Sequence, residues 1–568
     1  MVLRVTAPSL ALAISLAQAL AAQPISPAGR APDIPTVPPQ STAAATISAG
    51  QPLDPLVPLP SFTLVYPYST SSLSSATVGA RPVTSLAEAI VLTYRSSPQL
   101  LAQRDRLRST DFRLPEARAL YGPTIDATAS YAFSHDRTDI LPGSALTQQG
   151  FTSAASLILH QPLFTFGRNK AAESGAISQI AFDRDTLRIV EAQVMLDVVT
   201  AYVSVLREAG AVTIASQNVA LLERQYADSV TRFRVHEISA TDLRQVETRL
   251  GFASGQLLAA KGELGASQGR FLRDVGAPPG DLRPPDVLTI PVADIGEAYA
   301  IADAESPVIR AARSREKFSR SAVQNAKAEF LPRIDMRSSA GYGSVTPYSD
   351  GRRMTQLRSE AILTLPLVSG GLREARLGSA REGNQADWRL IDQAQRETRG
   401  AVAEAWNRLA ASRAALGYYL NAVEAARRAY QGGLQQERAG VITTVDLLDL
   451  ARDLITVQNN YNTALANEYL ARASLLSAMG RLEAPRLINV AAYDATAHFR
   501  EIAHRSDLPL LTPLLSVLDG LVLPAVDGDR PIRDPASTTA TTAIVPLPPE
   551  SAVIRADPTV ALGPEDGS

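Results

Sequence analysis

The stretch Ser85-Leu-Ala-Glu-Ala-Ile90, followed by Ser97-Pro98, occurs again in the second half of the chain as Asp294-Ile-Gly-Glu-Ala-Tyr299, followed by Ser306-Pro307. The correspondence continues downstream in five further pairs: Pro123 with Pro332, Pro162-Leu163 with Pro366-Leu367, Ala201-Tyr202 with Ala405-Trp406, Asp242-Leu243 with Asp446-Leu447, and Gly276 with Gly480. The offset between copies changes only between residues 123 and 162. A unit of this length is a duplicated half-protein, because solenoid repeats have periods of about 20–50 residues.

The duplication divides the 568-residue chain into five segments. They are a signal peptide at 1–22, a Pro-rich linker at 23–83, a first repeat at 84–290, a second repeat at 291–483 and a low-complexity tail at 484–568. The export signal is predicted from a positive residue, Arg4, an apolar stretch over 10–20 and the small residues after it. An alanine-rich helix start is the alternative. In the tail, 508–526 is apolar, but its prolines and glycine argue against a membrane-spanning helix.

The composition argues against several functional classes. The chain has no cysteine, which removes disulfides, thiolate chemistry and cysteine-linked lipid anchors, and its net charge of −2 predicts no nucleic-acid partner. The five histidines are scattered without metal-ligand spacing: His135, His160, His236, His498 and His504. We find no Walker A loop, nucleotide-binding glycine fingerprint or nucleophile elbow. We therefore expect no enzyme, no cofactor and no metal site.

Long stretches without proline, at 169–231 and 373–440, predict very long helices in both repeats. A helix of about 60 residues reaches roughly 90 Å. In the second stretch, apolar residues recur at the spacing of a coiled-coil seam, which Arg413 interrupts: Val402, Trp406, Leu409, Leu416, Leu420 and Val423. Since no run of 18 or more apolar residues follows the signal peptide, we expect no membrane-spanning helix.

Short alternating segments lie between the predicted helices. One face of the segment after Pro123 carries Ile125, Ala127, Ala129, Tyr131 and Phe133, and the segment after Pro332 carries Ile334, Met336, Ala340 and Tyr342. Return strands near 152–164 and 356–368 would complete two hairpins, at 123–164 and 332–368, across polar loops. Strands of about 10 residues with one apolar face suit a transmembrane barrel wall, although half-buried soluble hairpins show the same alternation.

The number of strands has a consequence for assembly. Two hairpins supply four strands, whereas about eight are needed for a barrel that only fills with side chains. Open sheet edges are not tolerated in lipid. If the strands cross a membrane, several chains must share one barrel, and three chains would supply about twelve strands and a pore.

The order of helix, hairpin and long helices, repeated once, resembles the TolC family of outer-membrane export channels. The motifs that carry the resemblance are Ser85-Leu-Ala-Glu-Ala89 with Ser97-Pro98, Leu331-Pro332, Gln161-Pro-Leu-Phe-Thr-Phe-Gly-Arg168, Leu365-Pro-Leu-Val-Ser-Gly-Gly371 and Gly440-Val-Ile-Thr-Thr-Val-Asp-Leu-Leu-Asp449. The resemblance covers about 84–483 and holds in both repeats. It implies a mainly α fold with a small β part: a homotrimer whose shared β-barrel in the outer membrane of a Gram-negative bacterium continues into a periplasmic α-helical barrel.

The resemblance also implies a function and partners. Such channels passively conduct substrates from an inner-membrane ABC or RND-type transporter, through a periplasmic adaptor (membrane fusion) protein, in type I protein secretion or multidrug or solute efflux. The Ala405-Trp406-Asn407 region and the Met479-Gly480 ending look closest to type I secretion members. A periplasmic coiled-coil scaffold without a pore is the alternative, but it does not require two alternating hairpins at equivalent places.

Asp446 and Asp449 are the candidate pore-constriction residues. They are three apart, share a helix face, and fall where the family carries its constriction carboxylates. In a trimer they would form a ring of carboxylates that favours cations. Asp446 has a counterpart in Asp242 and could instead close a capping box, whereas Asp449 corresponds to Gln245. Asp449 is therefore the better pore candidate.

The chain departs from the family at its gate. The family's gate tyrosine and arginine align here with Glu437 and Ile442. A latch built from tyrosine and arginine is therefore not expected at these positions.

Overall fold

The computed structural model describes residues 81–141, 144–488, 490–509 and 511–523, all of which belong to the second of two compact units, Leu73–Ser568. The predicted signal peptide lies outside the described residues, as do nearly all of the Pro-rich linker and the end of the tail. The described residues are mainly helical with one small sheet, which confirms the predicted fold class.

Each repeat opens with helices separated by the Ser-Pro pair. They are α2 (Leu86–Ser96), α3 (Pro98–Asp111) and α4 (Arg113–Ala119) in the first repeat, and α7 (Ile295–Glu305) and α8 (Pro307–Ala328) in the second. Ser85 and Asp294 cap α2 and α7 by accepting a bond from the backbone N–H three residues later. Proline suits the first turn of α3 and α8, because the first N–H groups of a helix have no internal partner.

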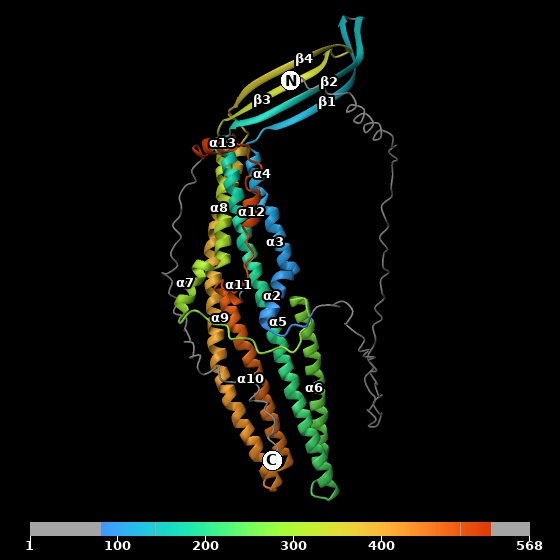
Figure 1. The fold of residues 1–568 in the computed structure, drawn as a ribbon, viewed down its shortest axis with the longest axis vertical. Coiled ribbons are helices and arrows are strands. Elements are labelled where there is room, and N and C mark those ends of the chain that lie inside the picture. The colour runs from blue at the N-terminus through green and yellow to red at the C-terminus, as the bar shows by residue number, and fades with distance from the viewer. Residues whose placement is uncertain (1–80, 142–143, 489, 510, 524–568) are drawn as a thin grey trace, which may run out of the picture. The chain divides into compact units, whose positions relative to one another are not determined.

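The long helices of each repeat form a helical hairpin (Figure 1). In the first hairpin α5 (Arg168–Arg234) is followed by α6 (Ala240–Val275), and in the second α9 (Leu372–Arg438) is followed by α10 (Thr444–Ala478). Both α5 and α9 are 67 residues long, as the proline-free stretches predict. Gly167 and Gly371 precede them at φ 87° and 81°, a left-handed conformation that turns the chain sharply from strand to helix at little cost for glycine.

The main core lies where the long helices of both repeats meet the opening helices. Of the six predicted seam residues, Val402, Trp406, Leu409, Leu416 and Val423 are buried and Leu420 is partly buried. Arg413 is also buried and donates to Glu468, which accepts from Arg472 as well. The seam therefore continues past Arg413, because the buried charge is paired.

One long helix contains an apolar stretch that packing within the chain explains. A stretch of α5 is long and apolar enough, by length and composition, to cross a membrane. Half of that stretch is buried within the chain, and Val194, Met195 and Val198 belong to the main core. Packing between helices accounts for its apolar character.

The four strands form one antiparallel sheet in the order β1-β2-β3-β4. They are β1 (Thr124–Leu141), β2 (Ser144–Phe164), β3 (Arg333–Thr346) and β4 (Ser349–Thr364). The two hairpins join through β2 and β3, which leaves β1 and β4 at the edges. The strands are longer than the expected ten residues: pairing continues through the predicted polar loop, for example between His135 and Gln149, because backbone bonding does not require apolar alternation.

The strand register separates an apolar face from a polar face. Ile125 pairs with Leu159, and Leu157, Ala340 and Leu357 lie opposite one another on three successive strands. This face carries large exposed side chains, including Tyr131 at 70%, Phe151 at 51% and Leu357 at 79%. The other face carries His160, Arg337 and Glu360, aligned across β2, β3 and β4. An exposed apolar face of this extent indicates contact with another apolar phase.

The tail is more structured than its composition predicts. It forms α11 (Ala484–Leu487), α12 (Ala497–Ile502) and α13 (Leu511–Gly520), and α12 and α13 pack on α3 and α5. Pro513 fits in α13 because it lies in the first turn. Three short helices thus lie in the predicted low-complexity tail, and α12 and α13 are positioned by contacts with distant residues rather than by their own periodicity.

Candidate functional site: the tips of the helical hairpins

Matching capping boxes close the two hairpin tips. At the first tip, Ser239 Oγ donates to Asp242 Oδ2 at 2.8 Å, and Asp242 N donates back at 3.1 Å. At the second tip, Thr443 Oγ1 donates to Asp446 Oδ2 at 2.7 Å, and Asp446 N donates back at 3.2 Å. The hydroxyl and the N–H of Thr443 lower the pKa of Asp446 by bonding its ionised form. Within one chain, the geometry assigns Asp446 the capping role.

Asp449 has a different environment. Its Oδ1 accepts from Arg249 Nη2 at 2.9 Å and lies 3.8 Å from Arg452 Nη1. Arg249 belongs to α6, so this ion pair joins the second hairpin to the first. The side chains of Arg249 and Asp449 are 32% and 45% exposed, which leaves the pair accessible to water.

Glu437 makes a second link between the hairpins. Only 6% of this residue is exposed, and its Oε1 accepts from Arg232 Nη1 on α5 and from Thr444 Oγ1 at 3.2 Å. The hydrogen bond that Arg232 donates to Glu437 raises the pKa of Arg232. Ile442 is partly buried and lies beside Gly433 of its own hairpin. At the two positions aligned with the family's gate tyrosine and arginine, this chain thus has a buried carboxylate paired with a partly exposed arginine, and an apolar contact.

The residues that sequence reasoning missed are Arg249 and Arg232, the partners of the two carboxylates. A comparison of charges between the copies carries a signal for one of them, because Arg249 corresponds to Asp453 in the second repeat. Reversed charges at equivalent positions are compatible with pairing between repeats. In the same comparison Glu437 corresponds to Phe233 of the first repeat, so the buried carboxylate is also specific to the second tip.

Beside the Arg249–Asp449 pair lies a hollow between the hairpins. Its volume is about 540 Å³, and its lining includes Leu222, Phe252 and Leu448. Phe252 is 70% exposed, so packing between the hairpins is incomplete here. Leu222 and Leu448 are nevertheless buried in one apolar cluster, so apolar contact joins the two hairpins as well as the ion pair.

Comparison with known protein families shows to which family this chain belongs. The family model described as "Outer membrane efflux protein" matches residues 89–271 and 298–481. The chain belongs to the outer membrane efflux protein family. The two matched ranges correspond to the two repeats, and the TolC-family resemblance is confirmed.

Individual relatives agree with this membership. The chain is 26% identical over 418 residues to the outer membrane efflux protein BepC of Brucella suis, across 73% of this chain and 90% of BepC. It is 25% identical to the alkaline protease secretion protein AprF of Pseudomonas aeruginosa, across 60% of this chain and 72% of AprF. The crystal structure of the outer membrane protein VceC from Vibrio cholerae shares the fold, with a TM-score of 0.61 and 18% identity, across 70% of this chain and 96% of that one.

These relationships establish the broad function. The chain is an outer-membrane channel protein for secretion or efflux, with a periplasmic part. The family is one of transport channels rather than enzymes. The exposed apolar face of the sheet is the part of this chain suited to contact lipid, and a periplasmic scaffold without a pore is set aside.

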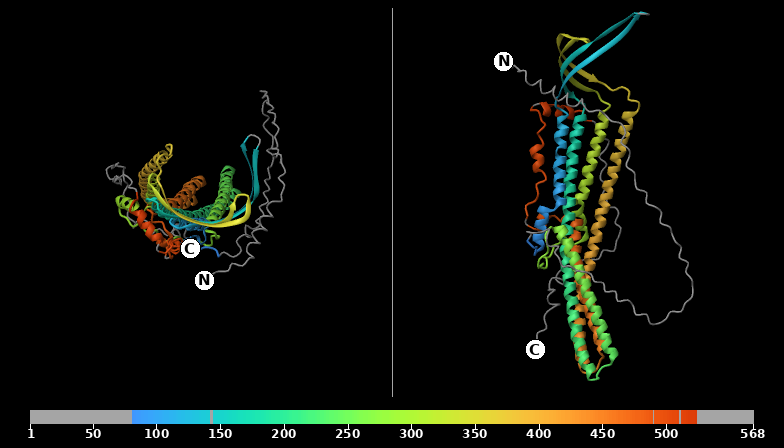
Figure 2. Two further views of the ribbon diagram at one scale, coloured as in Figure 1. Left: turned by 90° about the horizontal axis from the view of Figure 1, so that it is seen from above. Right: turned by 90° about the vertical axis from the view of Figure 1, so that its right-hand side faces the viewer.

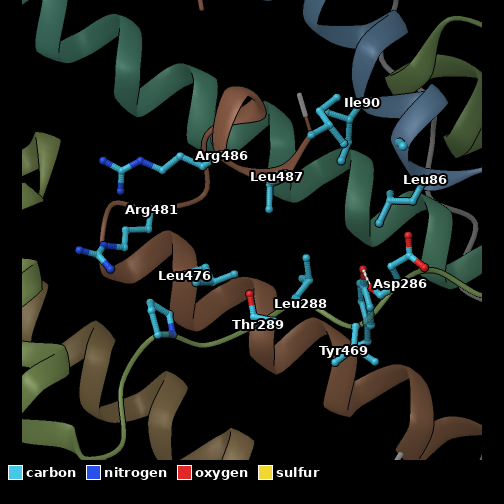
Figure 3. Close-up of a pocket in the computed structure, with 14 residues that line it drawn as sticks. Leu86, Ile90, Asp286, Leu288, Thr289, Tyr469, Leu476, Arg481, Arg486 and Leu487 are labelled. Atoms are coloured by element: carbon cyan, nitrogen blue, oxygen red, sulfur yellow. Dashed lines mark hydrogen bonds between the residues drawn. The ribbon is translucent and has the colours of Figure 1, made fainter. Parts of the chain in front are cut away.

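A second concavity of this efflux-family chain lies between α2, α10, α11 and the segment that follows α6 (Figure 3). Arg481 and Arg486 at its rim donate to Glu305 at 2.6 and 2.8 Å, and Tyr469 donates to the carbonyl of Asp286 at 3.0 Å. Bonds from Arg481 and Arg486 lower the pKa of Glu305 to about 2. Because both arginines are already paired with this carboxylate, the hollow is not an anion site.

Proposed function

We propose that three copies of this chain share one β-barrel in the outer membrane and form a passive conduit through it. The observation that carries the proposal is the sheet itself, which has an apolar face, a polar face and two unpaired edges, β1 and β4. Unpaired edges are too costly in lipid, so β1 of one copy must pair with β4 of the next. A barrel of about twelve strands is wide enough to leave a lumen.

The conduit would receive its cargo from a periplasmic adaptor (membrane fusion) protein and an inner-membrane transporter of the ABC or RND type. The relatives AprF, named for secretion, and BepC, named for efflux, support both types of transport. Neither the sequence motifs nor the hairpin tips supply a way to hydrolyse nucleotide. Energy would therefore come from the partner transporter.

The hairpin tips would form the periplasmic entrance. The ion pairs Arg249–Asp449 and Arg232–Glu437 would hold the two hairpins of one chain together in the closed entrance. Separation of the hairpins would break both pairs and release Asp449 toward the pore axis. Three copies of Asp449, with three copies of Asp446 one turn away, would then favour cations at the constriction.

The assembly is tested by outer-membrane fractionation and by gel migration with and without heating. We expect the chain in the outer-membrane fraction as an oligomer that migrates as a monomer only after heating, since a closed barrel resists detergent. A soluble periplasmic monomer would disprove the shared barrel.

The entrance is tested by conductance in planar lipid bilayers. Asp449→Asn is expected to lower the preference for cations over anions, because it removes one charge per chain from the constriction. Asp242→Asn is the matched control, since Asp242 closes the equivalent capping box at the first tip, and it should leave selectivity unchanged. If both variants keep the selectivity of the original channel, the carboxylate ring is wrongly assigned.

A further inference from the structure

The short helix α13 has its polar side chains turned toward the protein. Asp519 is 2% exposed, and it accepts from Thr165 N at 2.9 Å and from the Thr165 hydroxyl. Ser516 lies between Lys170 Nζ, at 3.3 Å, and a carboxylate oxygen of Glu173, at 3.2 Å. These contacts fix the rotation of α13 about its own axis.

The outward face of α13 and of the turn after it is apolar. Leu514 is 58% exposed, Val517 64%, Leu518 40% and Leu521 78%. A helix on a water-facing surface has the opposite arrangement, with its apolar stripe inward and its polar residues outward. The inverted arrangement indicates that α13 lies against an apolar phase.

The position of α13 in the fold indicates what its apolar face contacts. Thr165, which binds Asp519, directly follows the last residue of β2, so α13 lies where the sheet meets the helical part. Figure 2 shows α13 on the convex side of the curved sheet, next to that junction. The tail reaches this place along the first repeat: His498 contacts Asp111 at 2.9 Å, and Asp507 binds Arg118 at 3.2 Å.

A second copy of the chain is a less suitable occupant. In the shared barrel, copies join at β1 and β4, whereas α13 packs on α5 and β2, and β2 is an interior strand of the sheet. In a closed barrel the convex face of the sheet is the outer one, so α13, which lies on the convex side in Figure 2, is placed outside the barrel within one chain. It also lies at the end of the sheet nearest the periplasmic helices.

We propose that α13 is an interfacial anchor whose apolar face inserts into the periplasmic leaflet of the outer membrane beside the barrel. The bound partner is phospholipid, whose acyl chains contact Leu514, Val517 and Leu521. The anchor rests on the proposed barrel. It gives the channel a membrane attachment at its junction without a lipidated cysteine.

The absence of cysteine from the whole chain allows a direct test. The full-length channel carrying Val517→Cys is labelled with an environment-sensitive fluorophore and reconstituted in vesicles of phosphatidylethanolamine and phosphatidylglycerol. Val441→Cys is the matched control, because Val441 is the same residue type with 71% exposure at the hairpin tip. Leu357→Cys, on the apolar face of β4, reports on the barrel itself.

We expect the label at Val517→Cys to be quenched by spin-labelled phospholipid and protected from aqueous iodide, with the reverse at Val441→Cys. Iodide quenching at Val517→Cys, with lipid quenching retained at Leu357→Cys, would overturn the anchor and leave the barrel standing. Loss of lipid quenching at Leu357→Cys would instead overturn the barrel. A disulfide between two chains through Val517→Cys would show that a second copy covers the face, which also contradicts the lipid anchor.

Discussion

The two hairpin tips have nearly the same backbone and different charges. Ser239 with Asp242 and Thr443 with Asp446 make the same capping box with bonds of closely similar length. Outside the box the tips diverge: Asp449 and Glu437 of the second tip bind arginines of the first hairpin, and the first tip has no carboxylate at either equivalent position. Features shared by the copies build each hairpin, and features that differ join one hairpin to the other.

Equivalent residues of the two repeats also differ in the main core. Tyr202 and Trp406 occupy equivalent positions and are both almost fully buried. Tyr202 donates to the carbonyl of Arg283 at 2.6 Å, which ties the segment after α6 to the core. Glu191 corresponds to Gln395, so one copy has a carboxyl where the other has an amide. Where equivalent residues differ, a substitution can be made in one repeat, and the equivalent residue of the other repeat serves for comparison.

The largest expected effect comes from the aromatic pair. Trp406→Ala should lower the free energy of unfolding by about 3–5 kcal/mol, because it leaves a large cavity in the core. Tyr202→Phe keeps the packing and removes the hydroxyl that donates to the carbonyls of Arg283 and Thr84, which costs about 1 kcal/mol. Heat-induced loss of helical circular dichroism measures both. Equal losses would mean that the hydroxyl bond of Tyr202 matters as much as the packing of the whole Trp406 ring.

Glu437→Gln should have the next largest effect. It leaves Arg232 without its buried carboxylate partner, and we expect a loss of about 2–3 kcal/mol together with longer open times in bilayers. Glu237→Gln is the control, because Glu237 binds the same arginine at 3.2 Å but its side chain is 59% exposed. If the control opens the channel as readily, burial of the ion pair is not what holds the hairpins together.

Glu191→Gln copies the residue of the second repeat into the first and should act only at higher pH. Burial, with the nearby charge of Glu483 as a smaller cause, raises the pKa of Glu191 to about 7 from a reference value of 4.5. The folded chain therefore keeps a proton that the unfolded chain loses, and stability present below pH 4.5 is lost as the pH rises through 7.

The variant lacks this titration, so its stability relative to the original chain should increase by roughly 2 kcal/mol between pH 5 and pH 8. Thermal unfolding at both pH values measures the difference. A gain of the same size at pH 5 would show that packing, rather than ionisation of Glu191, is responsible.

The smallest effect is expected at the capping boxes, where the copies agree. Ser239→Ala and Thr443→Ala should each cost about 1 kcal/mol, because each removes the side-chain acceptor for an N–H in the first turn. Hydrogen exchange at the two tips should accelerate to a similar extent. A clearly larger effect of Thr443→Ala would mean that Asp446 does more than cap α10.

Much of the architecture could be predicted because its signals are local. The long helices follow from the absence of proline and the spacing of Trp406 and its neighbours, and the strands follow from the alternation after Pro123 and Pro332. Where alternation ends, near Ser134, the prediction of a loop failed, because the hydrogen-bond ladder continues in polar sequence. Asp446 was predicted as either a cap or a pore residue, and local sequence could not choose between them.

The sequence by itself determined two equivalent halves, their helices and strands, and the face of each strand that carries apolar residues, because these properties depend on neighbours a few residues apart. Only the tertiary structure decided that β2 pairs with β3, that Arg249 binds Asp449 across 200 residues, and that Asp519 binds Thr165 across 354. Those contacts depend on how separate elements are placed, and no short-range pattern encodes that placement. The inverted helix α13 shows the difference most clearly: its apolar residues are visible in the sequence, but the side they face is set by distant partners.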